Sequence, residues 1–221
     1  YALTPAGGVK WIFRVANANA LQPVSVGTDG TIYFASIASI YAINPDGTLK
    51  WTFTDPAFST VFAGPTVGPD GNIYGATSDV GGLNGGLGAF VLSPVGTLLS
   101  SFPGFSTRFG YSNIEVAFGP SQWYFTNNAT GGVSDAGSIW AFSLGSTNLI
   151  WNQGAIGQPR VQPSGNVVVG DGNPVHPGLK DFNPGGSLVW SALGEGTPND
   201  SQTSVDVGSD GLVYVGTLAF G

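Results

Sequence analysis

The sequence predicts an all-β protein made of five similar repeats, each a four-stranded antiparallel sheet. The composition supports this, because 36 Gly and 15 Pro among 221 residues supply many turns, while 42% apolar residues can form a large core. Two short phrases also alternate five times along the chain, which gives a mean repeat of about 44 residues. Four short strands in a repeat of that length are typical of a β-propeller blade. The prediction is therefore one five-bladed β-propeller domain over residues 1–221.

One phrase predicts the two outer strands of each repeat. Its clearest copies run from Tyr1 to Trp11 and from Tyr41 to Trp51, where an apolar strand leads into a turn with Pro and Gly and then into a strand that ends on Trp. Alternation of apolar and polar residues on both sides of a Gly-containing turn favours an antiparallel hairpin. Looser copies occupy 90–100, 141–151 and 181–190.

The other phrase predicts the two inner strands. It runs from Val24 to Tyr33 and from Pro65 to Tyr74, with looser copies at 116–124, 159–168 and 205–214. Most copies carry Asp-Gly or Ser-Gly at the centre, and a glycine there supplies the positive φ that a tight hairpin turn needs. Each repeat is therefore predicted to consist of two hairpins in succession.

The phase of the repeats predicts how a ring would close. Residues 213–221 align with residues 32–40, and the next position of the repeat is Tyr41, whose counterpart is Tyr1. The fifth blade is thus predicted to combine inner strands from 203–221 with outer strands from 1–14. Ladder hydrogen bonds between the N- and C-terminal strands would then close the ring without an exposed seam.

These phrases resemble the PQQ-like (quinoprotein-type) β-propeller repeat. The resemblance is closest over residues 24–53, fair across the termini and weakest over 115–151. It implies that a Trp of each repeat docks between neighbouring blades, a role that falls to Trp11, Trp51, Trp151 and Trp190. Because such propellers include quinone-dependent dehydrogenases, outer-membrane assembly lipoproteins and surface proteins, the resemblance points to a fold more than to a function.

The composition excludes several classes of function. Six Lys and Arg against 13 Asp and Glu give a net charge of −7, which disfavours nucleic acid as a partner. Without Cys and with one His, the chain offers no thiol nucleophile, disulfide framework or multi-His metal site. No apolar run approaches 18 residues, so no membrane insertion is expected. Neither a cofactor nor a metal is predicted, since the quinone enzymes of the family usually have eight blades and many carry a Cys pair.

The first strand of each repeat is predicted to line the central channel. Its channel-facing residues are expected to be Ser25, Thr66, Ala117, Arg160 and Asp206. A glycoside hydrolase needs two carboxylates across the sugar, whereas this set holds only Asp206, next to Arg160 of the preceding repeat. An ion pair between these two residues is the simplest interpretation, and the chain is predicted to have no catalytic residues and not to be an enzyme.

A few further residues carry minor hypotheses. Asn128 and Asn199 each begin a sequon for N-glycosylation. His176 lies in a loop bounded by prolines and is expected at the surface. Four further carboxylates are interpreted as turn residues: Asp29, Asp46, Asp70 and Asp210.

The predicted function is that of a secreted, extracellular or cell-surface β-propeller that acts as a non-catalytic binding or structural module. Its predicted partners are copies of itself, or another surface protein or glycan. Exchange of terminal strands between copies would give a homopolymeric filament. The alternative is a carbohydrate-binding lectin, in which a tyrosine stacks on a sugar. The candidate tyrosines are Tyr33, Tyr74, Tyr124 and Tyr214. A quinone-dependent redox enzyme and a glycoside hydrolase rank below the lectin.

Overall fold

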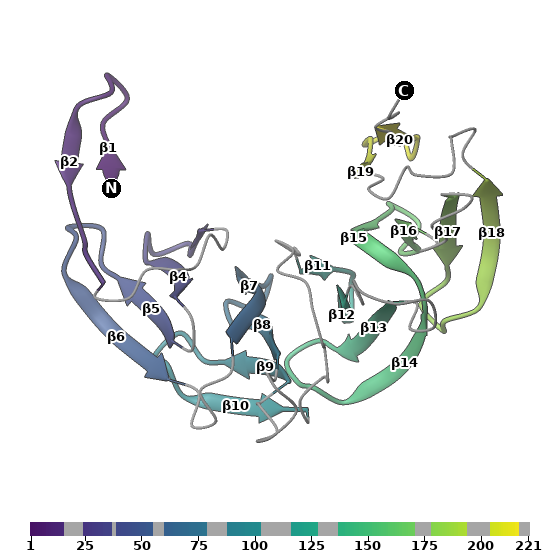
Figure 1. Cartoon of the computed structure of the whole chain (residues 1–221), viewed down its shortest axis with the longest axis horizontal. Coiled ribbons are helices and arrows are strands. Elements are labelled where there is room, and N and C mark those ends of the chain that lie inside the picture. The colour runs from purple at the N-terminus through teal and green to yellow at the C-terminus, as the bar shows by residue number, and fades with distance from the viewer. Residues whose placement is uncertain are drawn as a thin grey trace. The chain divides into compact units, whose positions relative to one another are not determined.

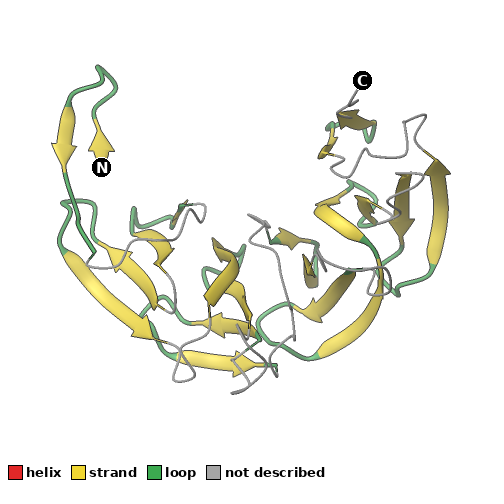
Figure 2. Ribbon diagram, in the orientation of Figure 1, coloured by secondary structure: helices red, strands yellow, loops and turns green. Residues whose placement is uncertain are grey.

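The computed structural model confirms the all-β class. It describes residues 1–15, 24–36, 39–54, 60–78, 88–102, 116–127, 137–170, 178–193 and 204–216. Over these residues the chain forms twenty strands joined by turns and loops, and no helix (Figures 1 and 2). The chain divides into two compact units, Tyr1–Ser106 and Thr107–Gly221, which are described separately below.

The first unit contains a hairpin and two four-stranded sheets. In each, consecutive strands pair antiparallel as a simple meander. The N-terminal hairpin is β1 (Ala2–Leu3) and β2 (Val9–Trp11). Sheet I is β3 (Ser25–Val26), β4 (Ile32–Ser36), β5 (Ser39–Ile43) and β6 (Leu49–Thr54), and sheet II is β7 (Thr60–Val67), β8 (Ile73–Ser78), β9 (Ala89–Leu92) and β10 (Leu98–Ser101).

The second unit contains two four-stranded sheets and then a hairpin, again with meander pairing. Sheet III is β11 (Ala117–Phe118), β12 (Gln122–Asn127), β13 (Ser138–Ser143) and β14 (Leu149–Gly154). Sheet IV is β15 (Ile156–Val161), β16 (Val167–Gly170), β17 (Gly178–Phe182) and β18 (Leu188–Leu193). The C-terminal hairpin is β19 (Ser204–Val207) and β20 (Val213–Gly216).

The inner turns follow the Asp-Gly pattern of the sequence. Gly30 has φ of 80° and donates its N–H to the Gly27 carbonyl, while the Asp29 carboxylate accepts from the N–H of Thr31. A side chain rarely adopts that φ, so the glycine and the acceptor carboxylate together fix the turn.

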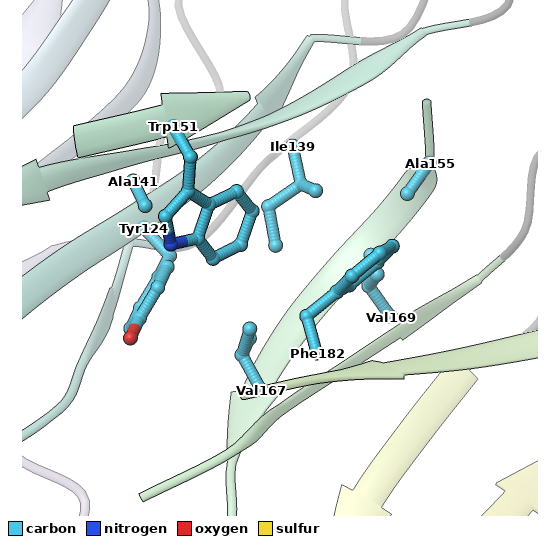
Figure 3. Close-up of a cluster of buried hydrophobic side chains, with 8 residues drawn as sticks. All are labelled: Tyr124, Ile139, Ala141, Trp151, Ala155, Val167, Val169 and Phe182. Carbon is cyan, nitrogen blue, oxygen red and sulfur yellow. The ribbon is translucent and has the colours of Figure 1, made fainter. Parts of the chain in front are cut away.

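The hydrophobic core lies between successive sheets. The middle strands carry the core residues, and β9 and β16 are buried at every position. One cluster joins sheet I, through residues such as Tyr33, to Phe90 of sheet II. A second joins Trp151 and Tyr124 of sheet III to sheet IV (Figure 3). Within each unit, successive sheets therefore pack face to face, as the blades of a propeller do.

The predicted four strands per repeat are present in four sheets. The predicted fifth repeat is represented by the two hairpins, each a separate two-stranded sheet in its own unit. Residues 217–221, which were expected to join this repeat, lie outside the described residues.

Candidate functional site: the tryptophan contacts and the two hairpins

One contact recurs between successive repeats within each unit. A tryptophan on the last strand of one repeat donates its indole N–H to a proline carbonyl in the outer turn of the next. The outer strand of each such repeat is therefore tied to the following one by the same hydrogen bond. The three pairs are Trp11 Nε1 to Pro45 O at 3.0 Å, Trp51 Nε1 to Pro94 O at 2.9 Å and Trp151 Nε1 to Pro184 O at 2.9 Å.

The turn that receives each indole needs a glycine for two reasons. Gly47 has φ of 91°, and a Cβ on it would lie 2.7 Å from an indole carbon of Trp11. Gly186 has φ of 83°, and its Cβ would lie 2.6 Å from Trp151. Real Cβ atoms do not approach so closely, so both the backbone angle and the packed indole require glycine. Gly96 repeats this arrangement with Trp51.

Aromatic neighbours complete the filled sites. The ring of Trp51 lies 5.8 Å from that of Tyr33. Trp151 lies 5.9 Å from Tyr124 of its own sheet and 5.7 Å from Phe182 of the next sheet (Figure 3). Trp151 is only 8% exposed, although the rest of its strand is exposed. Tilted aromatic pairs at such distances add to the stabilisation from burial.

The last strand of sheet II lacks the tryptophan of this contact. Ser100 occupies the strand position at which the other repeats place tryptophan, since it pairs with Val91 as Trp51 pairs with Ala42. The outer turn of sheet III also differs, because its Ser146 carbonyl accepts from Trp123 of the same sheet at 2.8 Å. Sheet II thus ends without the tryptophan of this contact, and the division into two units falls after it.

One tryptophan and one turn of this kind are left over. Trp190 on β18 packs on the cluster of Val168, Leu179 and Val205, but within the described residues its indole N–H has no hydrogen-bond partner. Gly7, in the turn between β1 and β2, has φ of 82°, and among the described residues no atom lies within 4 Å of the place for its Cβ. Among the described residues of its own unit, Trp190 thus has no receiving turn, and the turn at Gly7 has no indole.

Within its own unit, each hairpin also leaves one strand edge without a pairing partner. In the four-stranded sheets the second and third strands pair on both sides, whereas in the described chain β20 pairs only with β19 and β1 only with β2. Tyr214 on β20 is 57% exposed, while its counterparts in sheets I to III, Tyr33, Tyr74 and Tyr124, are at most 2% exposed. Those three buried rings cannot stack on a sugar, which removes most of the basis for the lectin hypothesis.

The residues predicted to line a channel all lie on first strands. Ser25, Thr66 and Ala117 are half-buried, on β3, β7 and β11 respectively. Arg160 on β15 places its Nε 3.8 Å from Oδ1 of Asp206 on β19, and Asp206 is largely exposed. This ion pair links sheet IV to the C-terminal hairpin.

Asp181 on β17 is a buried carboxylate that the sequence argument did not single out. It is 1% exposed, with Gln162 Nε2 donating to Oδ1 at 3.0 Å and Asn166 Nδ2 donating to Oδ2 at 2.9 Å. Burial raises the pKa of this carboxyl, and the hydrogen bond from Asn166 opposes the rise. The sequence carries one signal for this buried carboxylate. Sheets I and III have alanine at the equivalent repeat position, Ala42 and Ala141, where sheet IV has a charged residue.

The turn carboxylates have local structural partners. Asp29 accepts hydrogen bonds from the N–H of Thr31 and from Lys50 Nζ at 3.0 Å, and these bonds hold the pKa of its carboxyl well below the ordinary range. Asp70 accepts from the Tyr74 hydroxyl at 2.6 Å. Tyr124 is a core residue and not a turn carboxylate, and its burial raises the pKa of its hydroxyl to about 12. These groups stabilise turns and the core, as their sequence context predicts.

Some hypotheses concern residues that the structure does not describe. Asn128, His176 and Asn199 all lie outside the described residues. In the part of the chain that is described, no three acidic or histidine side chains gather as a metal site would require. Nor does any helix there have the length and apolar character to cross a membrane.

Solved structures similar to this chain are β-propellers of varied function. Virginiamycin B lyase from Staphylococcus aureus superposes with a TM-score of 0.64 at 13% identity, over 99% of this chain and 77% of the lyase. BamB from Moraxella catarrhalis gives a TM-score of 0.58 at 15% identity, over 95% of this chain and 63% of BamB. A quinohemoprotein alcohol dehydrogenase from Comamonas testosteroni gives 0.54 at 14%, over 90% of this chain and 40% of the enzyme.

These likenesses show a β-propeller fold and nothing finer. No family model and no curated protein matches the chain, so the resemblance to the PQQ-like repeat is not confirmed at the level of a family. At 13–15% identity, the function of a neighbour does not transfer to this chain.

The prediction that the chain is not an enzyme is contradicted by these neighbours. It rested on the scarcity of acid–base residues in the predicted channel set. A lyase and a dehydrogenase are among the similar propellers, so the same scaffold carries catalytic sites. The physical reason is that catalytic residues on such scaffolds can come from loops as well as from first strands, and an inventory of one strand column does not sample them.

Proposed function

We propose that this protein is an extracellular five-bladed β-propeller that acts as a structural binding module and assembles with copies of itself through its two hairpins. The observation that carries the proposal is that β1 and β20 each pair on one side only within their own units, in a fold whose other second and third strands pair on both sides. Unpaired edges with exposed apolar side chains favour strand addition. Each copy carries both edges, so β1 of one copy can pair with β20 of another.

The repeat supplies the register of the proposed pairing. In sheet I, Tyr33 lies opposite Ala42 and Ile32 opposite Ile43. Transferred to the hairpins, Tyr214 would lie opposite Ala2, and Val213 opposite Leu3. Strands β19, β20, β1 and β2 would then form a fifth four-stranded sheet with the strand order of the other four.

The hairpins also have the apolar surface that such pairing buries. Tyr1 is 82% exposed and Leu3 61% exposed on the N-terminal hairpin, and Tyr214 and Val215 are exposed on the C-terminal one. Each hairpin belongs to a different unit, and neither edge is covered within its own unit. Burial of large apolar side chains is the main favourable contribution to such an interface.

Assembly between copies gives a heterologous contact, with β1 of one molecule against β20 of the next. Such a contact repeats from copy to copy and builds a chain or a closed oligomer. With 9% charged residues, electrostatic repulsion between copies is low. The low charge also fits the proposed extracellular location.

Light scattering over a range of concentrations tests this proposal. We expect the wild type to give a mass above that of the 22.5 kDa monomer that rises with concentration. Tyr214→Lys places a charge at the proposed interface and should give a folded monomer, whereas Val26→Lys, at a 61% exposed site on β3, should assemble as the wild type does. A wild type that stays monomeric at all concentrations would overturn the proposal.

A further inference from the structure

We propose that Asp181, Gln162 and Asn166 form a pH-sensitive element between sheet IV and the C-terminal hairpin, and that ionisation of Asp181 loosens the hairpin. The inference concerns one chain and holds whether or not copies assemble. The residues that carry it all lie in the second unit.

Sheet IV departs from sheets I and III at three equivalent positions. In those two sheets a glycine opens the inner turn, a tyrosine ring packs beside it, and an alanine on the third strand pairs with the tyrosine. The sets are Gly27, Tyr33 and Ala42 in sheet I and Gly119, Tyr124 and Ala141 in sheet III. Sheet IV has Gln162, Val168 and Asp181 in these places. The Gln162 N–H donates to the Asn166 carbonyl at 2.8 Å, as Gly27 donates to Thr31, so the turn itself is kept.

The three exchanges compensate one another. Valine is smaller than tyrosine, and Gln162 brings a side chain where the other two sheets have none. Its Nε2 donates to Oδ1 of Asp181 at 3.0 Å, and Asn166 Nδ2 donates to Oδ2 at 2.9 Å. Asp181 is 1% exposed, and a polar group so buried is unfavourable unless it is hydrogen-bonded. The two amides therefore allow a carboxyl group at a core position.

Asp181 lies on the face of sheet IV that carries the C-terminal hairpin. It pairs with Val168 on β16, and the side chains of paired residues point to the same face of a sheet. Val168 packs in one cluster with Leu179 of β17 and Val205 of the hairpin. Leu179 precedes Asp181 by two residues on the same strand and so shares its face. A charge on Asp181 is thus a charge in the interface with the hairpin.

Few other ionisable groups border this interface in the described chain. Arg160 lies in the same row across sheet IV, and its Nε is 3.8 Å from Oδ1 of Asp206 on the hairpin. The hairpin also carries Asp210 in its turn and Tyr214 on β20. Lys180 points to the opposite face, where it donates to sheet III. Within the described residues no cation forms an ion pair with Asp181, so its charge has only the two amides for compensation.

The hairpin is the element that responds to this charge. In the described chain β19 and β20 form a separate two-stranded sheet, so side-chain packing and the Arg160–Asp206 ion pair hold them on sheet IV. Burial raises the pKa of Asp181, which means that the docked state favours the protonated form. The stabilisation of docking is therefore complete below pH 3.8 and is lost as the pH rises through the raised pKa.

Hydrogen exchange of the amides in β19 and β20 tests the inference. Their protection factors, which compare each rate with that of the unfolded chain at the same pH, should fall about threefold to tenfold from pH 4 to pH 7 in the wild type. In Asp181→Asn they should change by less than about twofold, because the side chain no longer ionises. Asp46→Asn is the matched control, since it makes the same change at an exposed turn of the first unit, and it should behave as the wild type does.

A triple variant provides a second measurement. Gln162→Gly with Val168→Tyr and Asp181→Ala gives sheet IV the residue set of sheets I and III, and its hairpin should stay protected with no dependence on pH over this range. Wild-type protection that is flat from pH 4 to pH 7 would overturn the inference. So would an equal fall with pH in Asp181→Asn, or in the triple variant, because the carboxyl would then not be its cause.

Discussion

Trp151 and Trp190 occupy the same position in two neighbouring sheets, yet only one of them is docked. Trp151 donates to Pro184, touches Phe182 and is 8% exposed. Trp190 is half-buried and its N–H has no partner in the described chain. The sheet that follows Trp151 has all four strands, whereas within the second unit the repeat that follows Trp190 is present only as the hairpin β19–β20. An indole is therefore docked where its own unit also holds the outer hairpin of the next repeat.

The largest expected effect comes from removing the docked indole. Trp151→Ala should lower the free energy of unfolding of the second unit by about 3–5 kcal/mol, because it deletes a buried ring and leaves a cavity. Trp190→Ala, measured in dilute protein, should cost about 1–2 kcal/mol, because part of that ring is already exposed. Denaturant unfolding measures both. If the two variants lowered the free energy of unfolding equally, Trp151 would not be more firmly packed than Trp190, contrary to this account.

A smaller effect is expected at the receiving turns. Gly186 and Gly7 have nearly equal φ, 83° and 82°, so alanine should strain both turns alike. Within its own unit, only Gly186 has an indole where the new methyl group would lie, and Gly186→Ala should therefore destabilise the dilute protein by about 1–3 kcal/mol more than Gly7→Ala does. Thermal unfolding below the concentration of assembly is the measurement. A Gly7→Ala variant as unstable as Gly186→Ala would mean that the first turn is already occupied in the single chain.

The smallest effect concerns pH. Asp181 lies opposite Trp190, where sheet III has Ala141 opposite Trp151, and burial raises the pKa of this carboxyl above its ordinary value of 3.8. The folded state therefore favours the protonated form. That stabilisation is fully present below pH 3.8 and is lost as the pH rises through the raised pKa.

The wild type should lose stability as the pH rises through the raised pKa of Asp181. Asp181→Asn does not titrate there, so its free energy of unfolding should fall less over the same pH range, by about 1 kcal/mol or less. Unfolding curves from pH 3 to pH 7 would measure it. Asp206→Asn is the matched control, because it makes the same chemical change at an exposed carboxylate. A pH profile of Asp181→Asn with the same slope as the wild type would show that this carboxyl does not titrate in that range.

Much of the fold follows from the repeated phrases. The hairpin turns at Asp29-Gly30 and Asp70-Gly71 were placed correctly because a tight turn depends on a few adjacent residues. Burial of Tyr33 and Tyr74 follows from the alternation of their strands.

Other features depend on contacts between segments that are distant in the sequence. Asp181 was missed because its amide partners, Gln162 and Asn166, lie 15 or more residues away on another part of sheet IV. The serine at position 100 was visible in the phrase, but the hydrogen bond from Trp123 to the Ser146 carbonyl of sheet III was not, because it joins residues 23 apart in the sequence. A propeller fold alone does not determine whether a site is catalytic, which is why the prediction on enzyme activity was wrong.

The central claim is that β1 of one copy pairs with β20 of another, and a designed disulfide tests it most directly. The natural chain has no cysteine, so Ala2→Cys with Tyr214→Cys introduces the only two thiols, at positions proposed to face each other. Leu3→Cys with Tyr214→Cys is the matched control, because Leu3 lies one residue along the strand and its side chain points to the opposite face. The account predicts a ladder of covalent multimers on a non-reducing gel for the first pair and little for the second. A cross-link confined to single chains, or none at all, would contradict it.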